Sequence, residues 1–125
     1  MTKHPTYDTA RTALDSGSTS CEQITRGYLD AIEQKKRLNA FLSVFNEKAI
    51  EQAREVDRKL AAGKAGRLAG MVVAVKDVLC LKDERTTCGS RILEKFVSLY
   101  TATAVKKLLA EDVILIGKTN MDEFA

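Results

Sequence analysis

Two short runs without a polar residue, Val72–Val75 and Val113–Ile116, constrain the fold of this chain most strongly. Strands of that length and composition are typical of sheets that are buried on both faces. Between the runs, the sequence from about Ala102 to Ala110 has helical spacing, with Thr101 as the expected cap. Strand, helix and strand in succession predict an α/β fold with a parallel, helix-covered sheet. The side chains expected to turn inward from this helix are Val105, Leu108 and Leu109.

Two helices are predicted in the first part of the chain. The first, Tyr7–Ser16, is stopped by Gly17. The second opens with a capping box, in which the Ser20 hydroxyl accepts from the amide of Gln23 and the Gln23 side chain reaches back. This helix should end near Lys36. Its apolar residues recur at helical spacing on one face: Cys21, Ile24, Tyr28, Ala31 and Ile32.

A strand and a third helix are predicted next. Leu38–Phe45 suits a strand, and Asn46 is the expected cap of a helix over Glu47–Ala62. Ala61–Gly70 is rich in Gly and Ala and predicts a loop. The third helix carries an apolar stripe that we interpret as core packing: Ile50, Ala53, Val56 and Leu60.

Composition is that of an ordinary globular protein. The length of 125 residues suits one domain or part of one. Hydrophobic residues make up 45% and charged residues 30%, and the formal net charge is only +3. Acidic and basic residues alternate, as in Glu51–Arg58, which is typical of a solvated helix face and not of a nucleic-acid-binding stripe.

Cysteine and histidine usage narrows the possible chemistry. The three cysteines, Cys21, Cys80 and Cys88, form no C-x-x-C pair, so neither a disulfide framework nor a zinc site is expected. The single histidine, His4, lies in a polar terminus, which argues against a histidine-based triad. No apolar stretch follows Met1–Pro5, so we expect no signal peptide or membrane span. Free thiols without an export signal predict a cytoplasmic protein.

Lys76 directly follows the first apolar run. The carboxyl ends of strands are where open α/β sheets bind their ligands. A lysine there either extends to solvent or lies in a cleft where it handles protons. Position alone favours the solvent interpretation, because most lysines are solvated surface groups.

The triplet Gly117–Thr119, which reads Gly-Lys-Thr, invites comparison with a phosphate-binding loop. That loop requires a glycine five residues before the second glycine, where Asp112 stands, and the residues between form the predicted strand. A nucleotide site is therefore not predicted. Lys118 is interpreted as a solvated or packing lysine after a strand.

A loop of small residues, Thr86–Ser90, follows a charged segment. It can be a turn with a helix cap, or a backbone wall beside a substrate. Cys88 lies within it and could act as a nucleophile only beside a base or a helix N-terminus. No histidine is near in sequence, so that role is not assigned.

Taken together, three segments resemble the amidase signature family: Gly70–Asp77, Thr86–Ser90 and Gly117–Ala125. Within it they are most similar to the glutaminase subunits of tRNA-dependent amidotransferases. The similarity also includes the capped helix and Leu38–Phe41, so it extends over nearly the whole chain. The order and spacing of the segments carry the resemblance, more than any single motif.

The resemblance implies a triad of two serines and a lysine, with one serine in a cis peptide. Lys76 takes the position of the family's ultimate proton acceptor, which acts through the bridging serine on the nucleophilic serine. Burial favours the neutral amine that such a base requires. The family's two serines lie in a later Gly/Ser-rich stretch, and neither Ser90 nor Ser98 is assigned to either role.

The resemblance further implies that residues 1–125 are the N-terminal part of one amidase domain. N-terminal helices over 1–62 would be followed by the start of a mixed, helix-covered sheet, in the strand-lysine and β-α-β region over 70–125. The whole protein would release ammonia from glutamine. A B subunit would use ATP and magnesium to amidate Glu-tRNA(Gln) or Asp-tRNA(Asn) with this ammonia, and a C subunit would be the third partner. No cofactor or metal is expected in this chain, which alone should be inactive and fold poorly.

Two other functions stay open. The chain can belong to another amidase of the same family that acts on a free amide, or it can be a non-catalytic α/β interaction module.

Five residues depart from the family's common pattern. Val72 and Ser98 stand where proline is frequent, and Val78 stands where asparagine is frequent. Asp83 and Asp112 stand where glycine is frequent.

Overall fold

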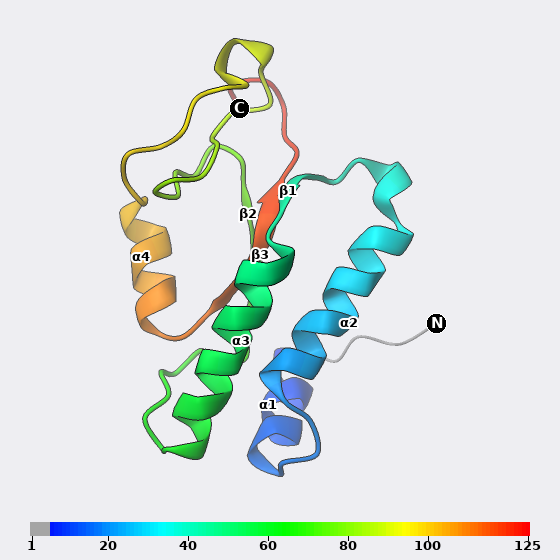
Figure 1. Cartoon of the computed structure of the whole chain (residues 1–125), viewed down its shortest axis with the longest axis vertical. Coiled ribbons are helices and arrows are strands. Elements are labelled where there is room, and N and C mark those ends of the chain that lie inside the picture. Colours follow the sequence, from blue (N-terminus) through cyan, green and yellow to red (C-terminus); the bar gives the residue numbers. More distant parts are fainter. Residues whose placement is uncertain (1–5) are drawn as a thin grey trace.

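Four α-helices and three strands occur along residues 6–125, the part of the chain that this computed structural model describes (Figure 1). His4 lies outside these residues. The helices are α1 (Tyr7–Asp15), α2 (Cys21–Gln34), α3 (Asn46–Ala61) and α4 (Thr103–Ala110). The strands are β1 (Phe41–Val44), β2 (Val72–Lys76) and β3 (Ile114–Thr119). Short 3₁₀ turns lie at Lys36–Leu38 and Arg91–Leu93.

The strands form one mixed sheet in the order β1-β3-β2. β2 and β3 are parallel and α4 connects them, which confirms the predicted β-α-β unit. β1 pairs antiparallel with β3, so β3 is the central strand. β3 also runs further than predicted, to Thr119. It passes through Gly117, where a side chain would collide with the carbonyl of Ser43 in β1.

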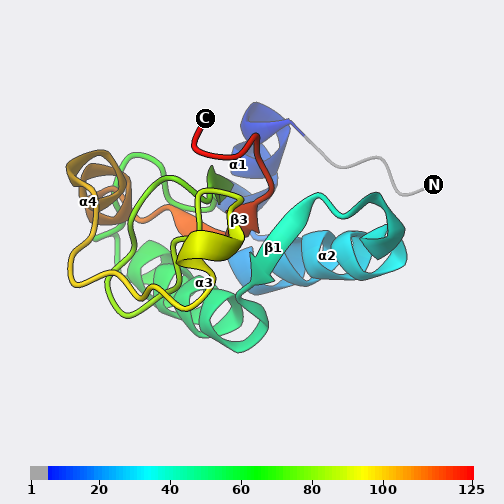
Figure 2. The same ribbon diagram turned by 90° about the horizontal axis from the view of Figure 1, so that it is seen from above.

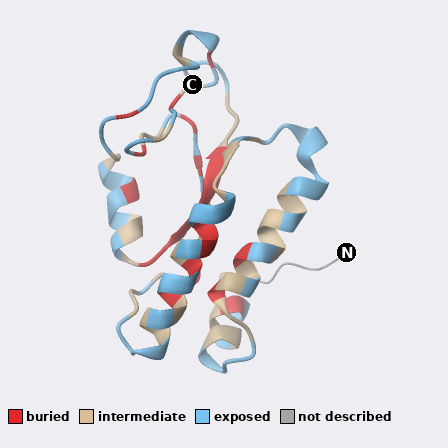
Figure 3. Ribbon diagram, viewed as in Figure 1, coloured by how far each residue is buried: buried red, intermediate tan, exposed pale blue. Residues whose placement is uncertain are grey.

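Helices pack on both faces of the sheet. On one face, Ile114 of β3 packs with Cys21 of α2 and Ala53 of α3. On the other face, Leu115 packs with Val105 of α4. Seen from above, α2 and α3 lie on one side of the strands and α4 stands apart from them (Figure 2). Buried residues accordingly follow β3 and the inner sides of α2 and α3 (Figure 3).

β2 is buried less completely than predicted. Val75 is buried, but Ala74 and Lys76 are exposed, so the prediction of burial on both faces is wrong for this strand. The reason is that Ala74 faces an apolar cavity of about 440 Å³ between the sheet and α2. The expected apolar face of α2 remains half-buried there, and the cavity is lined by its residues Tyr28, Ala31 and Ile32.

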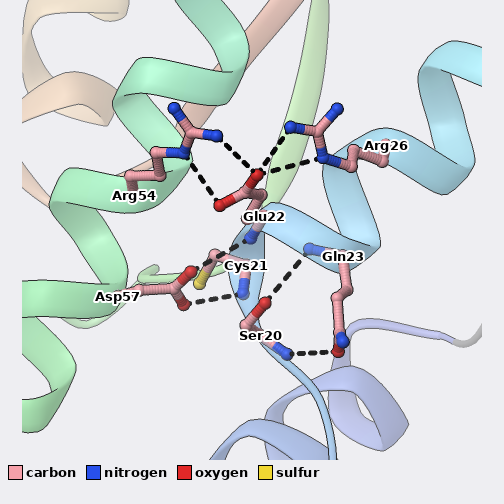
Figure 4. Close-up of polar contacts among 7 residues, drawn as sticks. All are labelled: Ser20, Cys21, Glu22, Gln23, Arg26, Arg54 and Asp57. Carbon is pink, nitrogen blue, oxygen red and sulfur yellow. Dashed lines mark hydrogen bonds and ion pairs between the residues drawn. The ribbon is translucent and has the colours of Figure 1, made fainter.

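The N-terminus of α2 is tied to α3 by a polar network (Figure 4). The capping box is confirmed, because Ser20 and Gln23 exchange both expected hydrogen bonds. Asp57 of α3 accepts from the backbone amides of Cys21, at 2.7 Å, and Glu22, at 3.1 Å. Burial and the nearby Asp57 carboxylate raise the pKa of the Cys21 thiol to about 12, so this cysteine is an inert packing group.

Two predicted helix caps are wrong. Asn46 is the first residue of α3, and the cap position is Phe45, which makes no side-chain capping bond. The cap of α4 is Ala102, because the Thr101 hydroxyl accepts from Lys82 N at 3.0 Å instead.

Among residues 6–125, no helix is long and apolar enough to cross a membrane.

Candidate active site

The three segments that carry the family resemblance meet where β2 and β3 end. Asp77 N donates to Thr119 O at 3.1 Å, which keeps the two strands together beyond the last residue of β2. Cys88 N donates to Asp77 O at 3.1 Å, and Phe124 N donates to Cys88 O at 2.9 Å. The loop after β2 and the segment after β3 therefore lie side by side above the sheet, as they do in Figure 2.

Lys76 is the last residue of β2 and is exposed to solvent. It pairs in register with Thr119 of β3, at the carboxyl edge of the two parallel strands. Ala74, two residues earlier on the same face, lines the cavity between the sheet and α2. The structure thus places Lys76 at the predicted edge, with its side chain open to solvent.

Lys118 is the buried lysine of this region, and sequence reasoning missed it. It has no exposed surface and lies within β3, so of the two interpretations, solvated or packing, the solvated one is wrong. Its Nζ lies 2.8 Å from Asp77 Oδ1 and donates to Thr86 Oγ1 and to Arg85 O, each at 2.9 Å. Three acceptors satisfy the three donors of the ammonium group, which is the condition for burying a charge.

An irregularity in strand pairing explains this burial. The register between β2 and β3 shifts after Val73, so that Val75 pairs with Lys118. Cross-strand partners share a face, and Lys118 therefore lies with buried Val75. The rule that singled out Lys76, a lysine at the carboxyl end of a parallel strand, applies equally to Lys118 and could have found it.

Asp77 connects the buried lysine to the small-residue loop. Its Oδ2 accepts from Thr87 N at 3.0 Å and from the Thr87 hydroxyl. Two residues on, Gly89 has a φ of 65° and approaches the C-terminal segment so closely that a Cβ would lie 2.8 Å from Met121 O. The loop is therefore held from both sides, by Asp77 beneath it and by Met121 beside it.

The two serines left without a catalytic role are engaged in structure. Ser90 Oγ donates to Glu123 Oε1 at 2.5 Å, and Ser98 Oγ donates to Tyr100 O at 2.7 Å. Ser98 N also donates to Glu84 O at 3.0 Å, a bond that the family's common proline could not make. Neither hydroxyl is free to act as a nucleophile in this arrangement.

A pocket of about 260 Å³, with several polar side chains in its wall, lies beside the small-residue loop. It is lined in part by Asp77 and offers hydroxyl, amide and guanidinium donors to a polar ligand. The side chains that line it include those of Ser43, Asp77, Arg85, Thr87, Ser90, Arg91 and Asn120. No group of three or more potential metal ligands of the His, Cys, Asp and Glu types occurs among residues 6–125.

The Gly-Lys-Thr triplet is part of β3, which confirms that it is not a phosphate-binding loop.

Cys80 is the thiol in this region whose pKa is altered. Hydrogen bonding with Ser98 lowers its pKa, with smaller contributions from Tyr100 and Thr86 and from the charge of Lys118. Sequence reasoning considered only Cys88 as a possible nucleophile.

Comparison with known proteins assigns this architecture. The model of the Amidase family matches residues 23–125. The chain is 48% identical, over 95% of its length, to the A subunit of the glutamyl-tRNA(Gln) amidotransferase of Chlorobium chlorochromatii, of which it spans 25%. The solved structure of an amidase family protein from Bacillus anthracis superposes with a TM-score of 0.89 at 31% identity, over 97% of this chain and 25% of that one. A peptide amidase from Stenotrophomonas maltophilia gives 0.85 at 28% identity, over 92% and 24%.

Proposed function

The chain belongs to the amidase family, and on that premise we propose that it is the N-terminal part of a glutamine-hydrolysing subunit of a tRNA-dependent amidotransferase. The observation that carries the proposal is the 48% identity to the A subunit of a glutamyl-tRNA(Gln) amidotransferase over 95% of the chain. Since the chain spans only a quarter of that relative, the activity proposed is that of a longer protein.

In the proposed reaction, Lys76 is the ultimate proton acceptor. A nucleophilic serine attacks the side-chain amide carbon of glutamine and passes its proton through a bridging serine to the lysine. Ammonia leaves with a proton returned along the same route, and water then hydrolyses the acyl-enzyme to glutamate. Both serines are proposed to lie outside residues 1–125, and the chain alone is proposed to be inactive.

The exposure of Lys76 fits a base that the remaining polypeptide covers. A general base must reach its neutral form, and a closed site that excludes water favours that form of an amine. The apolar cavity beside Ala74 is unfilled in this chain and lies on the same face of β2. We place the missing wall of the active site on that face.

The partners that we propose are those that the family resemblance implies. Ammonia from the glutaminase would pass to a B subunit, which would amidate Glu-tRNA(Gln) or Asp-tRNA(Asn) with ATP and magnesium, and a C subunit would complete the assembly. This chain would contact tRNA only through the complex, in a cytoplasmic setting.

A second candidate is an amidase-family hydrolase that acts on a free amide. It is favoured by the similarity of the fold to a peptide amidase, at a TM-score of 0.85. An interaction module without catalysis is the third alternative, and it predicts no hydrolysis of any amide.

Activity assays on glutamine, on misacylated tRNA and on peptide amides separate these candidates. The whole protein should release ammonia from glutamine and, with its B and C subunits present, convert Glu-tRNA(Gln) to Gln-tRNA(Gln). Efficient hydrolysis of peptide amides with no release of ammonia from glutamine would favour the free-amide hydrolase. Absence of both activities in a folded whole protein would favour the interaction module.

A further inference from the structure

We propose that Lys118 is a positioning residue that keeps Lys76 able to accept a proton, by neutralising Asp77. The inference rests on the proposed function of Lys76 as a base. Asp77 directly follows Lys76 in the chain. Their side chains leave the strand on opposite faces, since Asp77 meets Lys118 on the face of Val75 and Lys76 shares the face of Ala74. An unpaired buried carboxylate at this separation still stabilises the ammonium form of the lysine, which cannot accept a proton. A base at Lys76 therefore requires that the charge of Asp77 be cancelled.

The geometry of the pair meets this requirement. Lys118 Nζ lies 2.8 Å from Asp77 Oδ1, and the two residues are 0% and 1% exposed. Charges that are shielded from water act over longer distances than those at the surface, so Asp77 without its partner would be felt at the neighbouring residue. The second carboxylate oxygen is occupied by Thr87, which is neutral, so Lys118 is the only cation that the described residues place on Asp77.

Other charged groups surround the pair and the face that carries Lys76. The substitutions at Lys118 and Asp77 proposed here leave all of these surrounding groups in place. A change in the pH dependence of the reaction would therefore come from the Lys118–Asp77 pair. Beside Asp77 and Lys118 these groups are Cys80, Arg85, Arg91, Glu94 and, through Ser90, Glu123, and across the cavity that Ala74 lines they are Glu33, Lys35 and Lys36.

The proposal predicts shifts of opposite sign. The acidic limb of the kcat/KM profile reports the essential base of the free enzyme, and activity is lost as pH falls through it. Lys118→Met leaves the carboxylate of Asp77 unpaired, favours protonated Lys76 and moves the limb to higher pH. Asp77→Asn leaves the cation of Lys118, disfavours protonated Lys76 and moves the limb to lower pH. Each shift is expected to be about one pH unit, and the double variant should return the limb to the wild-type position.

The test uses the whole protein and ammonia release from glutamine as the probe. Lys59→Met is the matched control, because it breaks an ion pair of 2.6 Å to the buried Asp112, just before the start of β3. It should lower stability and leave the acidic limb in place. A role of Lys118 in stability alone would behave like this control.

Three outcomes overturn the proposal. They are a wild-type limb in both single variants, a shift of both in the same direction, and a displaced limb in the double variant. If one single variant does not fold, the direction of the shift in the other decides. The double variant buries no unpaired charge, so it remains the variant best able to fold.

The proposed function fails in a different way. If Lys76→Ala keeps full activity, the base has been misassigned. If Lys76→Ala is inactive but the charge variants keep the wild-type limb, only the role of Lys118 is wrong.

Discussion

Gln52 Oε1 of α3 accepts a hydrogen bond of 2.9 Å from Leu115 N of β3, and Gln52 Nε2 donates to Val113 O at 3.0 Å. β1 pairs with β3 only from Gly117 to Thr119, so the earlier part of β3 has no strand neighbour on that side. A single helix side chain therefore takes the place of a strand and satisfies two backbone groups of the buried central strand.

Replacing this side chain should destabilise the protein. Gln52→Leu leaves a donor and an acceptor of β3 unpaired, and the expected loss in the free energy of unfolding is about 2–6 kcal/mol, from about 1–3 for each group. Urea denaturation of the whole protein measures it. Gln34→Leu, at an exposed position at the end of α2, is the matched control and should change stability by less than about 0.5 kcal/mol. A loss no larger than the control's would show that water replaces the side chain without cost.

Asp83 and Asp112 both have left-handed backbone, with φ of 65° and 63°. Asp83→Gly relieves this strain and should raise the free energy of unfolding by roughly 0.5–1 kcal/mol. Asp112→Gly relieves the same strain but loses the ion pair with Lys59 and a hydrogen bond of 2.7 Å from Gly66 N, so a net loss is expected. Thermal unfolding of the two variants compares them, and changes of the same sign would contradict this account.

Positive φ at these two positions also gives the physical reason why glycine suits them. The sequence alone showed an unusual residue at each position, and only the backbone shows what the position demands.

Glu22 should make stability depend on pH. Hydrogen bonds from Arg54 and Arg26 hold its pKa at about 2, below the value of about 4.3 in an unfolded chain. Because the folded pKa is depressed, the stabilisation is present above about pH 4.3 and is lost as pH falls through about 2. Glu22→Gln should therefore lower the melting temperature near pH 6 but have little effect near pH 2. Melts at low and high salt complete the test, since salt screens an exposed network. A difference that is independent of pH would contradict the assignment.

Local sequence patterns were sufficient to predict the elements that depend on neighbouring residues or on periodicity. The capping box of Ser20 and Gln23 and the parallel strands around α4 depend on residues that are close in sequence or on periodicity, and the structure confirms both. The partner of β1 and the burial of Lys118 depend on register and on contacts between residues more than thirty positions apart. No periodicity encodes such contacts. For that reason the sequence left Lys118 as either a solvated or a packing lysine and did not predict its buried ion pair with Asp77.

The chain of 125 residues, expressed alone, should neither fold as a rigid monomer nor hydrolyse glutamine. Ala74 and the half-buried face of α2 expose an apolar cavity, and exposed apolar strands associate with other chains. Light scattering after size exclusion, a thermal melt and an ammonia assay measure both properties. A compact monomer with one sharp transition would contradict the first expectation. Turnover of glutamine would contradict the second, and alkylation would then test Cys88 as the nucleophile.

The central claim is that Lys76 is the base of a glutamine-hydrolysing amidase. The most direct measurement is the rate of ammonia release from glutamine by the whole protein with Lys76→Ala, beside Lys107→Ala on the exposed side of α4 as control. The account predicts that kcat falls by at least about a hundredfold in the first variant and is unchanged in the second. Full activity of a folded Lys76→Ala protein would contradict it.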